Sequence, residues 1–361
     1  MQPIKLYGGH VSLYTAKARA FLLNKRLPFD EIQATRSVYK DIVIPKTGVR
    51  YVPVVELPDG RFVQDTSEII DALDPLSPLN PAYPETPGQR LAALLMECVA
   101  DEWLLLPAML FRWTRNRDWA VKQFGMFSGP ELSVAQQHEI GEKLCQPFAG
   151  ALPLLGVTPE TTPAIDALYE DFLRLFADHL LQHRYVLGGR PTLADHALMG
   201  PLYGHLYRDP RSGEHMYTVA PRVADWVERM NFPPATFGDL AADDIVPEGV
   251  VAMLALLWRD YAGVVAGTLD ANAAWIAAHP GEELPRAIGQ QPFAIGQATG
   301  TRMIFPYTQW MWQRVADCWQ SFTRAQQAAV QPLVEGLGIA ELLAKPLAVR
   351  VERVNNKLMP A

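Results

Sequence analysis

The first 75 residues alternate between short strand-like runs and amphipathic helical stretches. Apolar and β-branched residues at alternate positions predict strands, and apolar residues repeating at helical spacing predict helices. By these criteria the strands cover residues 4–7, 29–34, 52–57 and 61–64, and the helices cover 16–25 and 67–73. Residues 35–51 show neither period and are predicted to be a loop. The resulting order, β-α-β, loop, β-β-α, is typical of a thioredoxin-like domain.

A proline-rich segment, residues 76–88, separates this unit from a region of different periodicity. From residue 89 to 231 apolar residues recur every three to four positions, which predicts a helical bundle. Within it, Thr192 and Asp195 have the spacing of a capping box and predict the start of a core helix.

The pattern breaks again in a linker near residue 232, and the rest of the chain forms a third unit, residues 232–361. A long apolar stripe follows from Val250 to Val264, and the glycine-containing segment 291–310 predicts a small hairpin. The predicted fold class is therefore α+β: a thioredoxin-like domain (1–75), a linker (76–88), an all-α domain (89–231) and an additional, mostly helical unit.

Composition narrows the class of protein further. The 361 residues carry a formal net charge of −7 and no run of Lys and Arg, which argues against a nucleic-acid partner. The three cysteines are far apart and form no C-x-x-C, and no apolar stretch resembles a signal peptide or a membrane span. We expect a cytoplasmic protein with no membrane partner. His179 and His183 stand four residues apart without a third ligand nearby in sequence, so no metal site is predicted.

Three motifs in this order carry a family resemblance: "VPVV" at 52–55, "QDTSEII" at 64–70 and "TLAD" at 192–195. Over about its first 230 residues the chain resembles the cytosolic glutathione S-transferase superfamily, in its serine-type, bacterial-like form, with a long C-terminal extension. The extension lies outside what the resemblance covers.

The resemblance implies a glutathione site in the first domain. A cis Val52–Pro53 bond would turn the Val52 backbone toward the cysteinyl part of the tripeptide, like an added strand. Asp65 and Thr66 match the family's acid–Ser pair at a helix N-terminus, where the acid takes the γ-glutamyl ammonium and the hydroxyl takes the carboxylate. Basic residues before Pro53 could meet the glycyl carboxylate, and Lys40, Lys46 and Arg50 all stay open for this role.

The chemistry implied is activation of the glutathione thiol by a hydrogen-bond donor between the first strand and the first helix. Ser12 aligns with the Ser or Cys of the family's S-P-x-x-x-K-V-R pattern, although Leu13 replaces the proline. Ser12 is the first choice and could equally be a helix cap. Tyr7 is the second choice and could equally be a core residue of the strand.

The acceptor would be a small apolar electrophile, bound between the first and second domains. Aromatic residues on and near the relevant helices could line that pocket, or could simply pack the core: Tyr14, Trp103, Phe111 and Trp113. The resemblance also implies a homodimer.

The expected activity is that of a glutathione transferase: conjugation, ether or halide cleavage, or isomerisation, with glutathione as co-substrate. The alternative is a non-catalytic protein that keeps this fold for binding, which the altered "DTS" and Leu13 would favour. A glutathione-dependent thiol reductase is disfavoured because no cysteine stands near position 12.

Overall fold

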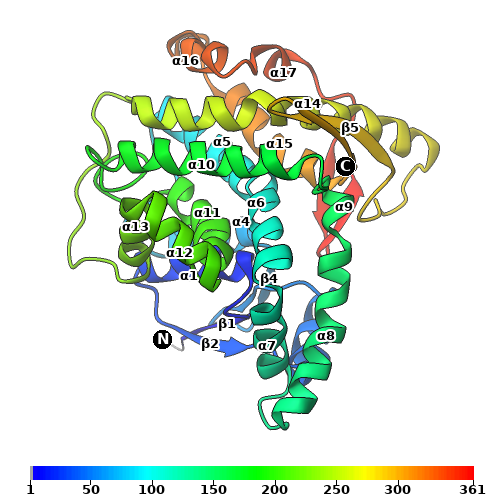
Figure 1. The fold of residues 1–361 in the computed structure, drawn as a ribbon. Helices are drawn as coiled ribbons and strands as arrows, with labels where there is room; N and C mark the ends of the chain where they lie inside the picture. The colour runs from blue at the N-terminus through cyan, green and yellow to red at the C-terminus, as the bar shows by residue number, and fades with distance from the viewer. Residues whose placement is uncertain (1–2) are drawn as a thin grey trace.

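The computed structural model describes residues 3–361 (Figure 1). Its first unit is a four-stranded sheet of order β2-β1-β3-β4, in which β1 and β2 are parallel and the other pairs antiparallel. This confirms the predicted thioredoxin-like arrangement. The elements are β1 (Ile4–Gly8), α1 (Leu13–Asn24), β2 (Phe29–Gln33), β3 (Val54–Glu56), β4 (Phe62–Gln64), α4 (Thr66–Leu73) and the 3-10 turn η2 (Asp74–Leu76).

The predicted loop over residues 35–51 was wrong, because most of it is helical. Thr35 caps this helix by accepting the Val38 N–H at 3.4 Å, and Gly48 ends it with a φ of +73°. Its apolar residue Val43 is fully buried in a small second core beside Tyr7 and Val54. Packing on the sheet thus stabilises a helix that has little amphipathic signal of its own. The segment contains α2 (Arg36–Val38), the π-helical turn η1 (Tyr39–Val43) and α3 (Ile44–Thr47).

The second unit is a helical bundle that begins at Pro87. The Thr86 side chain accepts no backbone N–H of the first turn of α5, and Asp244, far along the chain, accepts the Gly88 and Gln89 N–H groups at 2.8 and 2.9 Å instead. The bundle consists of α5 (Pro87–Glu102), α6 (Leu105–Leu110), η3 (Phe111–Arg115), α7 (Arg117–Ser128), α8 (Val134–Gly150), α9 (Leu152–Leu155), α10 (Thr162–His179), α11 (Leu193–Pro201), η4 (Leu202–Tyr207), α12 (Pro210–Val219) and α13 (Pro221–Asn231).

The predicted capping box of the bundle is present at the start of α11. The Asp195 carboxylate accepts the Thr192 N–H at 2.9 Å, and it also accepts the Val186 N–H and the Trp226 indole N–H. One buried carboxylate therefore fixes a helix start, a loop and a neighbouring helix at once.

The third unit is mostly helical, as predicted, and contains two hairpins. The first begins one residue before the predicted segment, and the second, at the C-terminus, was missed because each of its strands has only four residues. The elements are α14 (Glu248–Ala278), β5 (Gln290–Ile295), β6 (Ala298–Met303), α15 (Tyr307–Ser321), α16 (Arg324–Gly336), α17 (Ala340–Ala344), β7 (Val351–Val354) and β8 (Lys357–Pro360).

Helix α14 lies along α10 and also packs on α5 and α15 (Figure 1). Among residues 3–361 it alone has the length and composition that would suffice to cross a membrane, and 44% of its apolar stretch is buried inside the protein. The buried residues include Val250, Leu257 and Tyr261. This contact pattern is that of a core helix, and one continuous hydrophobic core joins all three units.

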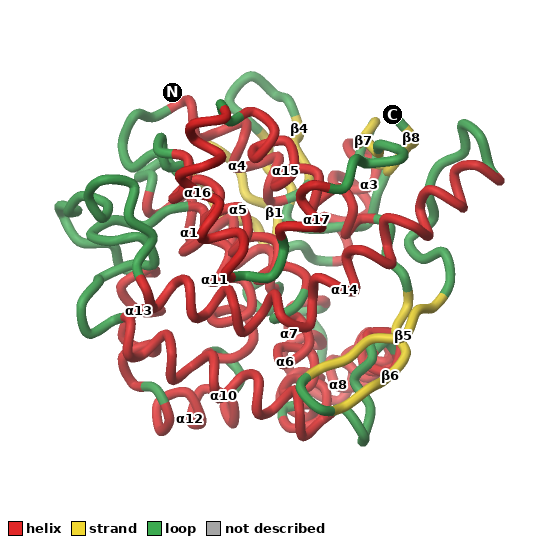
Figure 2. Tube along the Cα trace, turned by 90° about the horizontal axis from the view of Figure 1, so that it is seen from above, coloured by secondary structure: helices red, strands yellow, loops and turns green. Residues whose placement is uncertain are grey.

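Seen from above, α15 of the C-terminal unit lies beside α4 of the first unit (Figure 2), while β6 packs on α9 of the second unit. Helices α15 and α16 pack on α5, and the hairpin β7–β8 lies next to α3. The extension therefore reaches the part of the chain in which the sequence predicts the glutathione site.

Candidate functional site

The strand register brings three predicted site elements to one edge of the sheet. Val54 pairs with Tyr7 of β1 on one side and with Gln64 of β4 on the other. Because both pairings are antiparallel, one further residue on each strand continues the register. Gly8, Pro53 and Asp65 therefore lie side by side where the strands end. The Val52–Pro53 bond is cis, as predicted. Pro53 therefore lies between the turn that leads to Ser12 and the N-terminus of α4.

The turn from β1 to α1 is tightly built around Thr15. A Cβ on Gly8 would lie 2.4 Å from the Thr15 side chain, so only glycine fits there, and the Thr15 hydroxyl accepts the Gly9 N–H at 3.2 Å. Ser12 is the N-cap of α1, and its Oγ accepts the Thr15 N–H at 3.2 Å. This bond uses a lone pair of the hydroxyl and leaves its proton available for donation. The half-buried Ser12 can therefore cap the helix and still donate to a ligand.

Asp65 is the N-cap of α4 and adopts an unusual backbone conformation, with φ +85° and ψ 133°. Its Oδ1 accepts the Ser67 N–H at 2.9 Å. Its Oδ2 accepts the hydroxyl of Tyr307, the first residue of α15, at 2.5 Å. Thr66 begins α4 and is buried, with 4% of its surface exposed. The acid–hydroxyl pair thus stands at a helix N-terminus, with a residue of the extension already bound to the acid.

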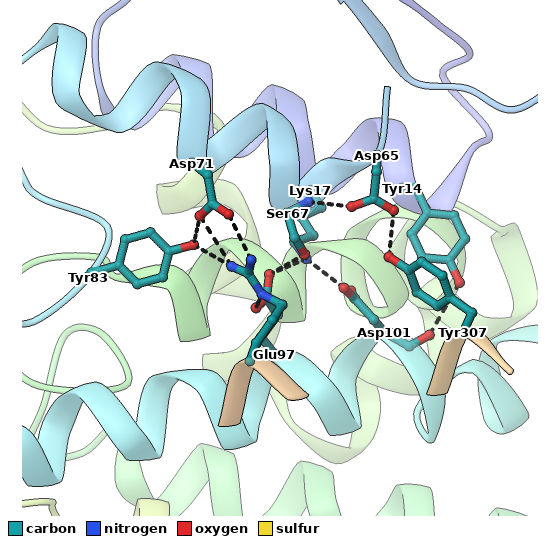
Figure 3. A network of polar contacts seen from close by, with 10 residues as sticks. Tyr14, Lys17, Asp65, Ser67, Asp71, Tyr83, Glu97, Asp101 and Tyr307 are labelled. Carbon is teal, nitrogen blue, oxygen red and sulfur yellow. Dashed lines mark hydrogen bonds and ion pairs between the residues drawn. The ribbon is translucent and has the colours of Figure 1, made fainter. Parts of the chain in front are cut away.

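A buried network of charges lies directly behind this helix start (Figure 3). The Lys17 ammonium lies 2.8 Å from Glu97 and 2.5 Å from Asp101, two carboxylates one turn apart on α5, and 3.4 Å from the Ser67 hydroxyl. Burial raises the pKa of Asp101 to about 7, although Lys17 opposes this shift. The buried Lys17 ammonium therefore pairs with two buried carboxylates and links α1, α4 and α5.

Arg314 of α15 connects this network to the C-terminal unit. Its guanidinium donates to Asp71 of α4 at 2.7 Å and to the Tyr83 hydroxyl at 2.7 Å, and it lies 3.5 Å from Glu97. Arg314 is thus a second residue of the extension, after Tyr307, that bonds to α4, the helix capped by Asp65.

The remaining residues predicted for the glutathione site lie in different surroundings. The Tyr7 side chain is buried in the second core and donates to Glu56 at 2.7 Å, and burial raises its pKa. Lys40 and Arg50 are exposed, and the exposed Lys46 has its ammonium 5.6 Å from the centre of the Phe62 ring. Tyr7 is thus not brought together with Ser12, and all three basic residues stay candidates for the glycyl end.

The four aromatic residues predicted for the acceptor pocket occupy separate environments. The Tyr14 hydroxyl donates to the Asp101 carbonyl at 3.3 Å and lies beside Tyr307 in Figure 3. Trp103 is completely buried against Tyr261 and Phe293 of the extension. Phe111 packs on Tyr169, and Trp113 stacks on Phe148. Among the described residues no ring contact joins any two of the four, and only Tyr14 lies beside the buried network.

Sequence reasoning missed the residues that complete the network. Glu97 and Asp101, four residues apart on an otherwise apolar helix face, were a readable signal for buried charge. Tyr307 and Arg314 carried no signal, because they contact α4 across more than 200 residues of sequence. Within residues 3–361 no cluster of three or more His, Cys, Asp or Glu side chains could hold a metal ion.

Comparison with known proteins supports the predicted family resemblance of the first unit. Residues 6–81 match the family model described as the N-terminal domain of glutathione S-transferase, which confirms the predicted resemblance there. Comparison with curated proteins found no matching relative.

Several solved structures are similar at low identity. A β-etherase from Sphingobium sp. strain SYK-6 is 19% identical, with a TM-score of 0.47, over 65% of this chain and 97% of that chain. A glutathione S-transferase from Methylobacillus flagellatus with glutathione bound is 19% identical, with a TM-score of 0.39, over 64% and 96% of the two chains. A glutathione S-transferase from Methylobacterium radiotolerans, in complex with glutathione sulfonate, is 21% identical, with a TM-score of 0.38. The similarity covers 68% of this chain and 100% of that chain.

Proposed function

We propose that this protein is a glutathione transferase, which binds glutathione in its first unit and activates the thiol for attack on an apolar electrophile. One observation carries the proposal: the register aligns Gly8, cis-Pro53 and Asp65 along one sheet edge, within the region that matches the glutathione S-transferase N-terminal domain. Asp65 and Thr66 would hold the γ-glutamyl end, and the Val52 backbone would pair with the cysteinyl residue.

Ser12 is the proposed catalytic residue. A free thiol has a pKa of about 8.5 and is mostly protonated near neutral pH. The Ser12 hydroxyl would donate a hydrogen bond to the thiolate sulfur, and the thiol proton would leave to solvent. The N-terminus of α1 would add favourable electrostatics for the negative charge. The thiolate then forms a carbon–sulfur bond with the electrophile, whose leaving group departs with the electron pair in a substitution.

The proposal extends to the substrate and the assembly. The acceptor would be a small apolar electrophile that undergoes conjugation, ether or halide cleavage, or isomerisation, and Tyr14 is the predicted pocket residue nearest to the buried network. A homodimer in the cytoplasm is the proposed assembly and location, and light scattering of the purified full-length chain would test the dimer.

The test compares the ultraviolet thiolate absorbance of bound glutathione in wild type and in Ser12→Ala. Ser133→Ala is a matched control, because Ser133 caps α8 in the same way and is exposed. We expect the thiolate signal to be lost at pH 7 in Ser12→Ala and kept in Ser133→Ala. Glutathione bound to the wild type without a thiolate signal would contradict the transferase and favour the non-catalytic binding protein.

A further inference from the structure

The C-terminal hairpin β7–β8 contacts the start of α4 through Arg353. The Arg353 guanidinium donates to the Gln64 side chain at 2.7 Å and to the Gln64 carbonyl at 3.3 Å, and its Nε donates to Glu68 at 3.0 Å. A further nitrogen of the same group lies 3.9 Å from Asp65 Oδ2. Only 8% of the Arg353 side chain is exposed. A buried cation therefore sits next to the acid that is expected to take the ammonium of glutathione.

The tip of the same hairpin contacts the other predicted end of the site. Asn355 and Asn356 form the turn with φ values of +51° and +64°, and the Asn356 amide donates to the Thr47 carbonyl at 2.9 Å. Thr47 is the last residue of α3, next to Lys46. The hairpin thus runs from the γ-glutamyl end, at Asp65, to the segment that holds the candidates for the glycyl end.

The rest of the extension holds the hairpin in this position. The Val351 N–H donates to the Gln313 side chain of α15 at 2.9 Å, and the Leu284 N–H donates to the Leu358 carbonyl at 2.9 Å. Each strand of the hairpin is therefore tied to the rest of the extension by hydrogen bonds, and displacement of the hairpin must break these bonds together with those of Arg353.

We propose that Arg353 limits the affinity of the first-unit site for glutathione by placing its charge next to Asp65, so that glutathione binds only when the β7–β8 hairpin is displaced. The inference rests on the proposed glutathione site. An ammonium group and the Arg353 guanidinium cannot share the Asp65 carboxylate without like-charge repulsion in a poorly solvated place. The Tyr307 hydroxyl already takes Oδ2. Removing the charge of Arg353 should therefore favour a ligand that carries an ammonium group.

The test measures glutathione affinity by titration calorimetry in the full-length chain. Arg353→Ala removes the cation, and Arg353→Gln removes the charge while keeping an amide that can bond to Gln64. Arg350→Ala is the matched control, because Arg350 immediately precedes β7 and pairs with Asp317 at the exposed surface. We expect both Arg353 variants to bind at least about tenfold more tightly than wild type, and the control to bind like wild type.

A second readout follows the hairpin itself. Hydrogen exchange of the Val351 and Leu284 amides should become faster when glutathione is added to the wild type, because displacement breaks their bonds to the Gln313 side chain and to the Leu358 carbonyl. The inference is overturned if the wild type binds glutathione and the Arg353 variants bind it equally or more weakly, or if exchange does not change. If neither the wild type nor either Arg353 variant binds glutathione, the proposed function itself fails.

Discussion

The Tyr307 hydroxyl donates to the Asp65 carboxylate at 2.5 Å, although 242 residues separate the two in sequence. Tyr307 begins α15 and Asp65 caps α4, so two helix N-termini from different units meet at one acid. Burial and the nearby negative charge raise the pKa of Tyr307 well above its ordinary value, which keeps the hydroxyl protonated as a donor. The C-terminal unit therefore contributes a direct partner to the candidate site.

Replacing Tyr307 by Phe should destabilise the protein by about 1 to 3 kcal/mol, because the Asp65 carboxylate, of which only 12% is exposed, loses a charged hydrogen bond. Tyr217→Phe is the control, since the Tyr217 hydroxyl also donates to a carboxylate, Glu228 at 2.9 Å, but Tyr217 is 47% exposed. Tyr217→Phe should lower the free energy of unfolding by less than about 0.5 kcal/mol. Urea unfolding measures both, and equal losses for the two variants would argue against a special role of Tyr307.

Arg112 forms a buried ion pair with Asp209 inside the second unit and also links this unit to the first through the Val11 carbonyl. Arg112 donates to the two Asp209 oxygens at 2.8 and 2.6 Å, and also to the carbonyls of Val11 and Gly204. Arg112→Leu leaves a buried carboxylate without its partner, and we expect a loss of about 3 to 5 kcal/mol.

The control for this prediction is Arg115→Leu on the same helical turn. Arg115 pairs with Asp166, and about a third of each side chain is exposed, so the expected loss is at most about 1 kcal/mol. Because Val11 precedes Ser12, Arg112→Leu should also weaken the thiolate signal of bound glutathione. Thermal unfolding that ranks the two variants in the opposite order would contradict this account.

The stability of the protein should fall as pH rises from about 4 to about 7, through the buried Asp101. Folding raises the pKa of this carboxyl from 3.8 to about 7. In that range the native state keeps a proton that the unfolded chain has already lost, so each rise in pH lowers the free energy of unfolding.

In Asp101→Asn this carboxyl no longer titrates. Between about pH 4 and about pH 7 the free energy of unfolding should therefore fall by about 1 to 3 kcal/mol less than in the wild type. Asp178→Asn, at an exposed position of α10, should keep the wild-type dependence. Denaturant unfolding at pH 5 and pH 8 provides the comparison, and an unchanged slope in Asp101→Asn would assign the effect to other groups.

Much of the fold was readable from local patterns. The alternation around Val54 predicted its strand, the X-Pro pair at Pro53 predicted the cis bond, and the Thr192–Asp195 spacing predicted the start of α11. These features are encoded within a few residues, where periodicity and capping chemistry act. The helix over residues 36–47 was missed because its stability comes from packing Val43 on the sheet and not from its own pattern.

The completed site could not be read in the same way. Asp65 was visible as a helix cap, but its partners Tyr307 and Arg353 lie at the start of an ordinary helix and in a strand of four residues. Nothing in either segment shows which acid it meets, because that depends on how α14 and α15 pack on α5. Long-range pairing of this kind follows from the tertiary fold alone.

The central claim is that Asp65 anchors glutathione in the first unit, and calorimetric titration of glutathione into wild type and Asp65→Asn tests it most directly. Asn at this position keeps an oxygen for the Ser67 N–H but removes the charge. Asp59→Asn, in the exposed turn between β3 and β4, is the control. The account predicts saturable binding to wild type and to the control, and at least about tenfold weaker binding to Asp65→Asn. Equal binding to all three chains, or no binding to either the wild type or Arg353→Ala, would contradict it.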